Sequence, residues 1–253
     1  MKTFFLLTVI FLGIGLLFWF VEQRTNFLDA PVPRGAGVNL LEEQSANEDT
    51  ASAQDETADQ EPVVEMVASG LDTPWSMVFT DPDRILVTER PGKIRVIEKG
   101  KLLPEPLYTF PEMSETGEEG LLSMTLDPEY PQNHFVYLVV AVPKNGGIVD
   151  RVMRFLDTGT ELANPSILID NIPAARFHAG SRVAFGPDGK LYVSTGDATD
   201  KNLAQDKKSL AGKILRINAD GGIPNDNPFS GSPVWSYGHR NPQGLAWDSA
   251  GNL

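Results

Sequence analysis

The chain of 253 residues contains no cysteine. This absence excludes disulfide bridges, thiol catalysis, thiolate metal sites and a lipid anchor on cysteine, but it does not identify the compartment. Histidine is also scarce, with three residues, so few side chains are available as a general base near neutral pH. The sequence has no basic stripe with interleaved aromatic residues, and we therefore do not expect it to bind nucleic acid.

Positive charge is missing from one stretch in particular. Eight acidic residues and no Lys or Arg lie between Glu42 and Glu61, and they account for much of the net charge of −13. Residues 22–61 also have few aromatics, so they cannot bury enough apolar surface to offset the entropy lost on ordering. We expect this region to be a disordered, self-repelling acidic linker. A binding role for the acidic tract is the alternative.

A long apolar run occurs at the N-terminus. Phe4 to Val21 is apolar except for Thr8, and as a helix it would rise about 27 Å, close to the thickness of a hydrocarbon core. We predict that residues 1–21 form an uncleaved transmembrane anchor; a cleaved signal peptide is the alternative, although no small-residue cleavage site follows. The protein would then be exported, either anchored and facing the periplasm or cell exterior, or secreted.

Residues 62–253 are predicted to form an all-β domain. Its short apolar runs alternate with turns rich in Gly and Pro. One hairpin pattern recurs, with anchor residues about 47, 59 and 62 residues apart at Phe79, Leu126, Phe185 and Trp247. Further strands are expected at 93–98, 152–156 and 213–218. Four-stranded units at this spacing are typical of a β-propeller, and a β-sandwich is the alternative.

The fourth copy of the hairpin stops at Leu253, where its second strand should begin. A propeller closes into a ring to eliminate its sheet edges, and three blades with a fragment cannot close. We therefore expect the chain to be an incomplete piece of a longer protein that covers roughly three to four blades.

The segment from Arg176 to Asp197 carries the most chemical information. It places His178 at the start of an alternating strand, which leads through a Gly-Pro-Asp-Gly turn into a second strand that ends at Asp197. Two strands joined by a tight hairpin can bring a base and its orienting carboxylate together. We predict that His178 is a general base and Asp197 its partner. The alternatives are a surface or core histidine and a turn-capping aspartate.

Several motifs occur in a characteristic order. They are Gly117-Glu-Glu-Gly-Leu-Leu122, Phe177-His-Ala-Gly180, Ser194-Thr-Gly-Asp197, Leu210-Ala-Gly-Lys-Ile-Leu-Arg-Ile-Asn218 and Tyr237-Gly-His-Arg-Asn-Pro-Gln-Gly244. Together they resemble the soluble, pyrroloquinoline-quinone-dependent aldose (glucose/sorbosone) dehydrogenases over about Val64 to Leu253. This resemblance implies a six-bladed propeller with the quinone (PQQ) at its wide central end. It also implies oxidation of an aldose at C1 by hydride transfer to the quinone.

The resemblance assigns roles to individual residues. His178 would remove the proton of the sugar hydroxyl, and Asp197 would orient the histidine. Arg240 and Asn241 would contact the quinone, and Arg240 would polarise the carbonyl group that accepts the hydride. These roles are physically sound, because hydride leaves a carbinol carbon readily when a base removes the hydroxyl proton, and a permanently charged planar donor suits the charge gained by the quinone.

Other site residues follow less directly from the resemblance. Glu118 would lie beside the cofactor, where the family often has Gln, and Phe177 stands where the family often has a polar residue. Gln205, together with Asp197, is predicted to contact the sugar. The resemblance also implies Ca²⁺, but the family's calcium ligands and further cationic quinone contacts come from blades beyond Leu253. We therefore assign no metal ligand within this chain.

Some polar residues are given structural interpretations. Asp81, Asp127 and Asp188 recur at the hairpin turns, which favours turn chemistry. His239 is predicted to hold its loop by a side-chain hydrogen bond. The oxygen-rich residues between Asp220 and Asn227 are interpreted as turn formers, with a calcium site as the alternative.

The sequence thus predicts an exported, PQQ-dependent aldose dehydrogenase with an unspecified electron acceptor. Because part of the site would lie beyond Leu253, we expect the chain by itself to be inactive. The alternative function is a non-catalytic extracellular propeller that binds a glycan or a protein partner. The charge of Glu118 and the missing cofactor contacts favour this alternative.

Overall fold

The computed structural model describes residues 64–253. The predicted anchor at 1–21 and the predicted linker at 22–61 lie outside the described residues. The described part is all-β with two short helices, which confirms the all-β part of the predicted fold class. None of the helices within residues 64–253 has the length and apolarity needed to cross a membrane.

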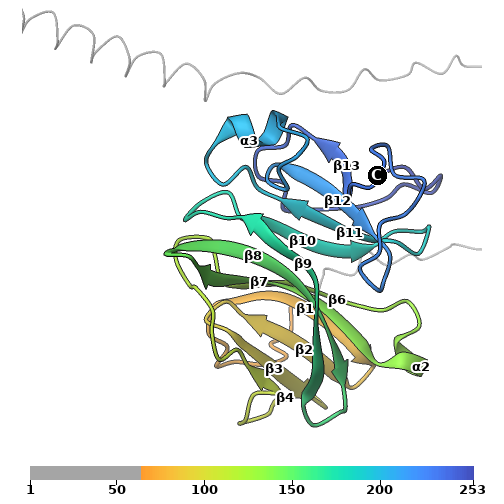
Figure 1. The fold of residues 1–253 in the computed structure, drawn as a ribbon. Coiled ribbons are helices and arrows are strands. Elements are labelled where there is room, and N and C mark those ends of the chain that lie inside the picture. Colours follow the sequence, from red (N-terminus) through yellow and green to blue (C-terminus); the bar gives the residue numbers. More distant parts are fainter. Residues whose placement is uncertain (1–63) are drawn as a thin grey trace, which may run out of the picture. The chain divides into compact units, whose positions relative to one another are not determined.

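Three antiparallel sheets follow one another along the chain, from the lower to the upper part of Figure 1. The first sheet contains β1 (Pro74–Asp81), β2 (Arg84–Glu89), β3 (Lys93–Glu98) and β4 (Lys101–Leu102), and β5 (Tyr108–Thr109) also pairs with β3. The second contains β6 (Leu121–Leu126), β7 (Phe135–Lys144), β8 (Gly147–Asp157) and β9 (Leu162–Pro173). The third contains β10 (Gly180–Phe185), β11 (Leu191–Thr195), β12 (Lys213–Ile217) and β13 (Val234–Tyr237). The two short helices are α2 (Tyr130–Asn133) and α3 (Lys201–Gln205).

The predicted repeat corresponds to these sheets. Phe79, Leu126 and Phe185 lie on the first strand of the first, second and third sheet, and the strands expected at 93–98, 152–156 and 213–218 are β3, part of β8 and β12. The fourth copy, after Gln243, forms only a turn in which the N–H of Asp248 donates to the carbonyl of Asn252 (3.0 Å). Each of the three sheets has the antiparallel arrangement expected for a propeller blade. The number of blades stays a prediction.

The second sheet is buried on both faces. Along β7, Val136, Leu138 and Val140 pack in the core shared with the first sheet, whereas Tyr137 and Val139 pack in the core shared with the third. Successive side chains of a strand point to opposite faces, so one continuous apolar run fills two cores. This packing holds the three sheets together and fixes the loops that carry the candidate site.

The recurring aspartates at the hairpin turns are structural, as predicted. Asp81 accepts a hydrogen bond from the backbone N–H two residues later (2.8 Å), and Asp127 and Asp188 do the same (3.0 and 3.1 Å). An Asp side chain stabilises a turn in this way because it replaces a backbone acceptor.

Candidate active site

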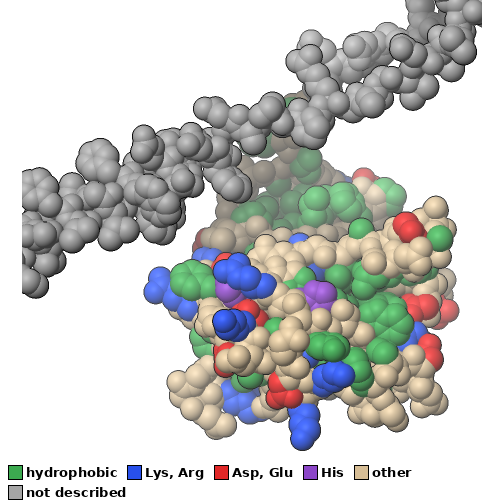
Figure 2. Space-filling view, turned by 90° about the horizontal axis from the view of Figure 1, so that it is seen from above, with side chains coloured by type: hydrophobic (Ala, Val, Ile, Leu, Met, Phe, Trp, Pro, Cys, Tyr) green, Lys and Arg blue, Asp and Glu red, His purple; other side chains and the backbone are tan. Residues whose placement is uncertain are grey.

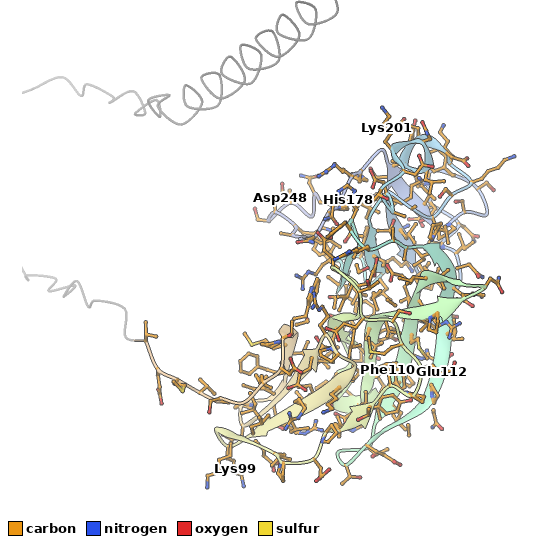
Figure 3. The ribbon with its side chains drawn as sticks, turned by 90° about the vertical axis from the view of Figure 1, so that its left-hand side faces the viewer. Lys99, Phe110, Glu112, His178, Lys201 and Asp248 are labelled. Atoms are coloured by element: carbon orange, nitrogen blue, oxygen red, sulfur yellow. The ribbon has the colours of Figure 1, made fainter. Side chains whose placement is uncertain are left out.

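His178 and Asp197 are in direct contact. His178 precedes β10 and Asp197 follows β11, and His178 Nδ1 lies 2.7 Å from Asp197 Oδ1. A carboxylate accepts hydrogen bonds, so Nδ1 is the donor in this contact, and in the neutral imidazole the lone pair is then on Nε2. The imidazole is 17% exposed and the Asp197 side chain 6% exposed, so the base is accessible while its partner is sheltered. In Figure 3, His178 lies among the loops of the third sheet, on the side of Lys201 and away from Lys99.

The backbone at the ends of β10 and β11 makes this contact possible. A Cβ atom on Gly196 would collide with the carbonyl oxygen of His178, so only glycine permits the two chain segments to approach this closely. The N–H of Gly196 donates to the carbonyl of Ala179 (3.2 Å). The turn from His178 to Ser181 is unusual, because His178, Gly180 and Ser181 have φ values of 65°, 64° and 63°.

Glu118, in the turn before β6, contacts the His178 turn. Its Oε2 accepts hydrogen bonds from the backbone N–H of His178 (2.9 Å) and from the side-chain amide of Asn241 (3.2 Å). Asn241 in turn accepts a hydrogen bond from the N–H of Gly180 (2.8 Å). Glu118 and Asn241 are therefore brought together with His178, and the Glu118 carboxylate is stabilised by amide donors on the turn.

Arg240 is joined to the same site through its backbone. The N–H of Asp197 donates to the carbonyl of Arg240 (2.8 Å). Arg240 is exposed, and its guanidinium forms no hydrogen bond or ion pair with another residue of the described segment 64–253. Figure 2, which looks onto the face at the top of Figure 1, shows histidine side chains beside Lys and Arg side chains. Because the Arg240 guanidinium is exposed and has no partner among residues 64–253, it is available to a ligand.

The two residues predicted to contact the sugar differ in exposure. Gln205 is exposed at the end of α3, and its Nε2 lies 3.1 Å from the position that a Cβ on Gly238 would occupy. It therefore lies beside the loop that leads to Arg240. Asp197 is buried and its Oδ1 is occupied by His178 and by the N–H of Thr199 (2.9 Å). This geometry favours the orienting role of Asp197 over direct contact with a substrate.

Lys213 is a positioning residue that the sequence did not reveal. Its buried ammonium group donates to the backbone carbonyls of Leu203 (2.8 Å), Ala204 (3.1 Å) and Ala211 (2.6 Å). Burial lowers the pKa of Lys213, and the charge of Asp206 opposes this shift. Lys213 thus ties α3 and the following loop to β12. Nothing in its strand pattern distinguishes it from an exposed lysine.

His239 has the structural contact that was predicted. Its Nε2 lies 2.8 Å from the hydroxyl oxygen of Ser236, and its backbone N–H donates to the carbonyl of Gly212 (3.1 Å). Burial lowers the pKa of His239, and the positive charge of Lys213 lowers it further. His239 therefore supports the loop next to Arg240 as a neutral side chain.

Residues 64–253 contain no group of three or more His, Asp or Glu side chains suited to hold a metal ion. In the oxygen-rich loop after Asp220, Asp226 and Asn227 instead accept hydrogen bonds from Arg216 (2.8 and 2.9 Å). These contacts agree with the structural interpretation of that loop.

A cavity of about 450 Å³ between the first and second sheets is not part of the candidate site. Its lining includes Arg84, Tyr130 and Asp157, and Asp157 accepts hydrogen bonds from both of the other two side chains (2.6 Å each). Because these groups satisfy one another, the cavity presents little unpaired polarity to a ligand.

Comparison with known proteins places this chain in a family. Residues 71–253 match the family described as glucose/sorbosone dehydrogenase. The PQQ-bound aldose sugar dehydrogenase of Streptomyces coelicolor is 41% identical, with a TM-score of 0.69, over 75% of this chain and 57% of that chain. Aldose sugar dehydrogenase YliI of Escherichia coli is 33% identical over 74% of this chain and 54% of its own length.

A more distant relative is not named as a dehydrogenase. The mouse Hedgehog-interacting protein is 26% identical over 73% of this chain and 31% of its own length. This chain spans about half the length of the curated dehydrogenases that it matches. On the match to residues 71–253, the chain belongs to the glucose/sorbosone dehydrogenase family.

Proposed function

We propose that the protein containing this chain oxidises aldose sugars at C1 with PQQ as cofactor and His178 as general base. The observation that carries the proposal is the 2.7 Å contact between His178 Nδ1 and the buried carboxylate of Asp197. This contact leaves Nε2 as the basic atom and holds the ring in one orientation. The similarity to a PQQ-bound aldose sugar dehydrogenase supports the same cofactor here.

The residues present fit a planar, anionic quinone. Arg240 offers an exposed guanidinium without an internal partner in the described segment, and Asn241 lies next to it. Glu118 would repel an anionic cofactor, but its Oε2 points to the backbone N–H of His178 and accepts a hydrogen bond from it. Arg240 and Asn241 would hold the quinone, which when bound supplies the hydride acceptor.

Each polar side chain then has a defined task. His178 Nε2 removes the proton of the C1 hydroxyl, and the Asp197 carboxylate stabilises the resulting imidazolium. The Arg240 guanidinium stabilises negative charge that develops on the bound oxidant. A positioned base of this kind contributes about 10²–10⁴-fold to rate.

We also propose where the enzyme is located, what accepts its electrons and where Ca²⁺ is bound. An anchor at 1–21 and an acidic linker at 22–61 would hold the enzyme outside the cytoplasmic membrane. Electrons would then pass to a membrane-bound or soluble acceptor. Ca²⁺ would be bound by residues beyond Leu253.

The test uses the full-length protein with PQQ, Ca²⁺ and an electron-accepting dye, and measures sugar-dependent dye reduction with a panel of aldoses. His178→Asn should lower kcat by about 10²–10⁴-fold. His134→Asn is a matched control, because His134 and His178 both have positive φ values (55° and 65°), which Asn tolerates. The proposal fails if wild type shows no sugar-dependent reduction, or if His178→Asn retains full activity.

A second candidate function is binding of a glycan or a protein partner without catalysis. It is favoured by the similarity to the Hedgehog-interacting protein and by the carboxylate of Glu118 beside the site. Equilibrium binding of PQQ separates the two functions. Saturable binding that depends on Arg240 supports the enzyme, and absence of binding supports the second candidate.

A further inference from the structure

Glu119 and Asp150 form a buried acid pair behind the His178 turn. Glu119 lies two residues before β6 and Asp150 lies on β8, and the two residues are 0% and 2% exposed. Asp150 pairs across the sheet with Ala141, whose N–H donates to the carbonyl of Gly120 next to Glu119 (2.9 Å), so the two acidic residues are neighbours. In the described part of the chain, neither carboxyl oxygen of Glu119 nor Asp150 Oδ1 has a hydrogen-bond partner.

No Lys, Arg or His among residues 64–253 forms an ion pair with Glu119 or Asp150. Of the nearby arginines, Arg90 donates to the carbonyl of Gly117 and to Glu115, and Arg151 donates to Asp170. The other charged group that acts on Glu119 is Glu118, which is also acidic. Two carboxylates that are buried together without a cation cannot both be ionised, because each would lose its hydration and repel the other.

The two acids are not equivalent. Burial and then the negative charge of Asp150 raise the pKa of Glu119 far above its ordinary value. Burial also raises the pKa of Asp150, but hydrogen bonds with Glu119 and Ser181 oppose this shift. Glu119 is therefore the member that holds a proton when Asp150 is ionised, and the pair titrates as a unit.

Ser181 connects the pair to the turn that carries His178. Its hydroxyl lies 3.0 Å from Asp150 Oδ2 and 2.7 Å from the carbonyl oxygen of Ala179. Ser181 is 1% exposed and has a φ of 63°, a conformation that non-glycine residues rarely adopt unless their surroundings enforce it. The contacts of its hydroxyl supply such a constraint.

We propose that Glu119 and Asp150 share one proton at neutral pH and that this acid pair, through Ser181, positions the turn that carries His178. Two consecutive glutamates then serve one turn in different ways. Glu118 accepts hydrogen bonds from the N–H groups of the turn, whereas Glu119 acts on it through Asp150 and Ser181. The role in positioning His178 rests on the proposed function; the sharing of a proton does not.

Proton sharing is tested by infrared spectroscopy on the full-length protein at pH 7. The difference spectrum between wild type and Glu119→Gln should contain the carbonyl band of a protonated carboxylic acid. The exposed Glu112→Gln is the control for the same substitution, and its difference spectrum should show the loss of an ionised carboxylate instead. A carboxylate band for Glu119 would overturn the proposal.

Stability against pH gives a second measurement. A carboxyl group whose pKa is higher in the folded state stabilises the fold at low pH, and this contribution is lost as the pH rises from the ordinary Glu value towards the raised one. Wild-type Tm should therefore fall relative to that of Glu119→Gln by about 3–5 °C per pH unit between pH 5 and 9. Parallel Tm curves for the two proteins would contradict a shared proton.

The positioning role is tested with Ser181→Ala and Ser181→Gly. Alanine removes the hydroxyl but keeps the Cβ, whereas glycine also relieves the backbone strain. Both variants should shift the NMR signal of the His178 Nδ1 proton and lower kcat about 10-fold or more, with KM little changed. If Ser181→Ala leaves this signal unchanged, the positioning role is wrong. The NMR measurement decides this even if the protein does not oxidise sugars.

Discussion

Asp197 donates its backbone N–H to the carbonyl oxygen of Arg240 over 2.8 Å, while its side chain holds His178 at 2.7 Å. One residue therefore ties the proposed base to the proposed cation, although Asp197 and Arg240 lie on different loops of the third sheet. Arg240 and His178 are thus connected through Asp197, by one backbone hydrogen bond and one side-chain contact.

Replacement of Asp197 by Asn tests the orientation of the base. An amide in place of the carboxylate no longer stabilises an imidazolium or enforces one tautomer, so kcat should fall by about 10²–10⁴-fold while PQQ affinity is retained. Asp200→Asn is the control, because Asp200 caps α3 by accepting from the N–H of Asn202 and Asn caps a helix equally well. Steady-state kinetics and quinone titration provide the two measurements. Equal kcat values for wild type and Asp197→Asn would refute the orienting role.

The charge of Arg240 is tested by Arg240→Gln. Loss of a charge-assisted hydrogen bond should weaken PQQ binding by about 10–100-fold, and Arg240→Lys should recover only part of it because Lys lacks the planar fork. Lys201→Gln removes one positive charge from the exposed side of α3 and should leave affinity nearly unchanged. An equal effect of Arg240→Gln and Lys201→Gln would show that Arg240 acts only through the overall charge of the protein.

Gly196 is expected to tolerate no side chain. Gly196→Ala places a Cβ against the backbone carbonyl of His178, so the two segments must separate, and unfolding free energy should fall by about 1–3 kcal/mol together with sugar oxidation. At Gly147 an added Cβ would lie 3.7 Å from the carbonyl of Lys144, an ordinary contact, so Gly147→Ala serves as control. Denaturant unfolding measures the first effect. Wild-type stability and activity in Gly196→Ala would show that this close approach is not required.

Asp170 should contribute to stability above acidic pH. Partial burial would raise its pKa, but hydrogen bonds from Lys144 and Arg151 outweigh that effect and lower the pKa to about 2. Because the folded-state pKa is depressed, the stabilisation is present above the ordinary Asp pKa and is lost as the pH falls towards 2. Tm values of wild type and Asp170→Asn should differ at pH 7 and converge between pH 4 and 2. A constant difference across this range would contradict an ionic contribution.

Much of the fold could be predicted because it is encoded locally. The continuous apolar run in 135–142, the aspartates at the turns and the hairpin pattern that recurs at Phe79, Leu126 and Phe185 are all read from residues close together in the sequence. The hairpin between β10 and β11 likewise predicted the meeting of His178 and Asp197. The fourth copy, around Trp247, was predicted to begin with a strand, but residues 243–253 form no strand in the structure.

Other features depend on contacts between distant segments. Glu118 and Glu119 are adjacent in sequence, yet one carboxylate faces the amides of the His178 turn and the other is buried against Asp150. In the sequence Lys213 is indistinguishable from other strand lysines, and only the folded structure shows that its ammonium group donates to a carbonyl of α3.

The sequence alone determined the all-β class, the four-stranded repeat and the pairing of His178 with Asp197, because period-two alternation and turn residues act over short distances. Only the tertiary structure decided which carboxylate serves the turn, which one is buried, and that Arg240 meets Asp197 through its backbone. Those outcomes depend on how the sheets pack face to face. Packing determines which side chains are buried, and burial in turn affects their ionisation and orientation.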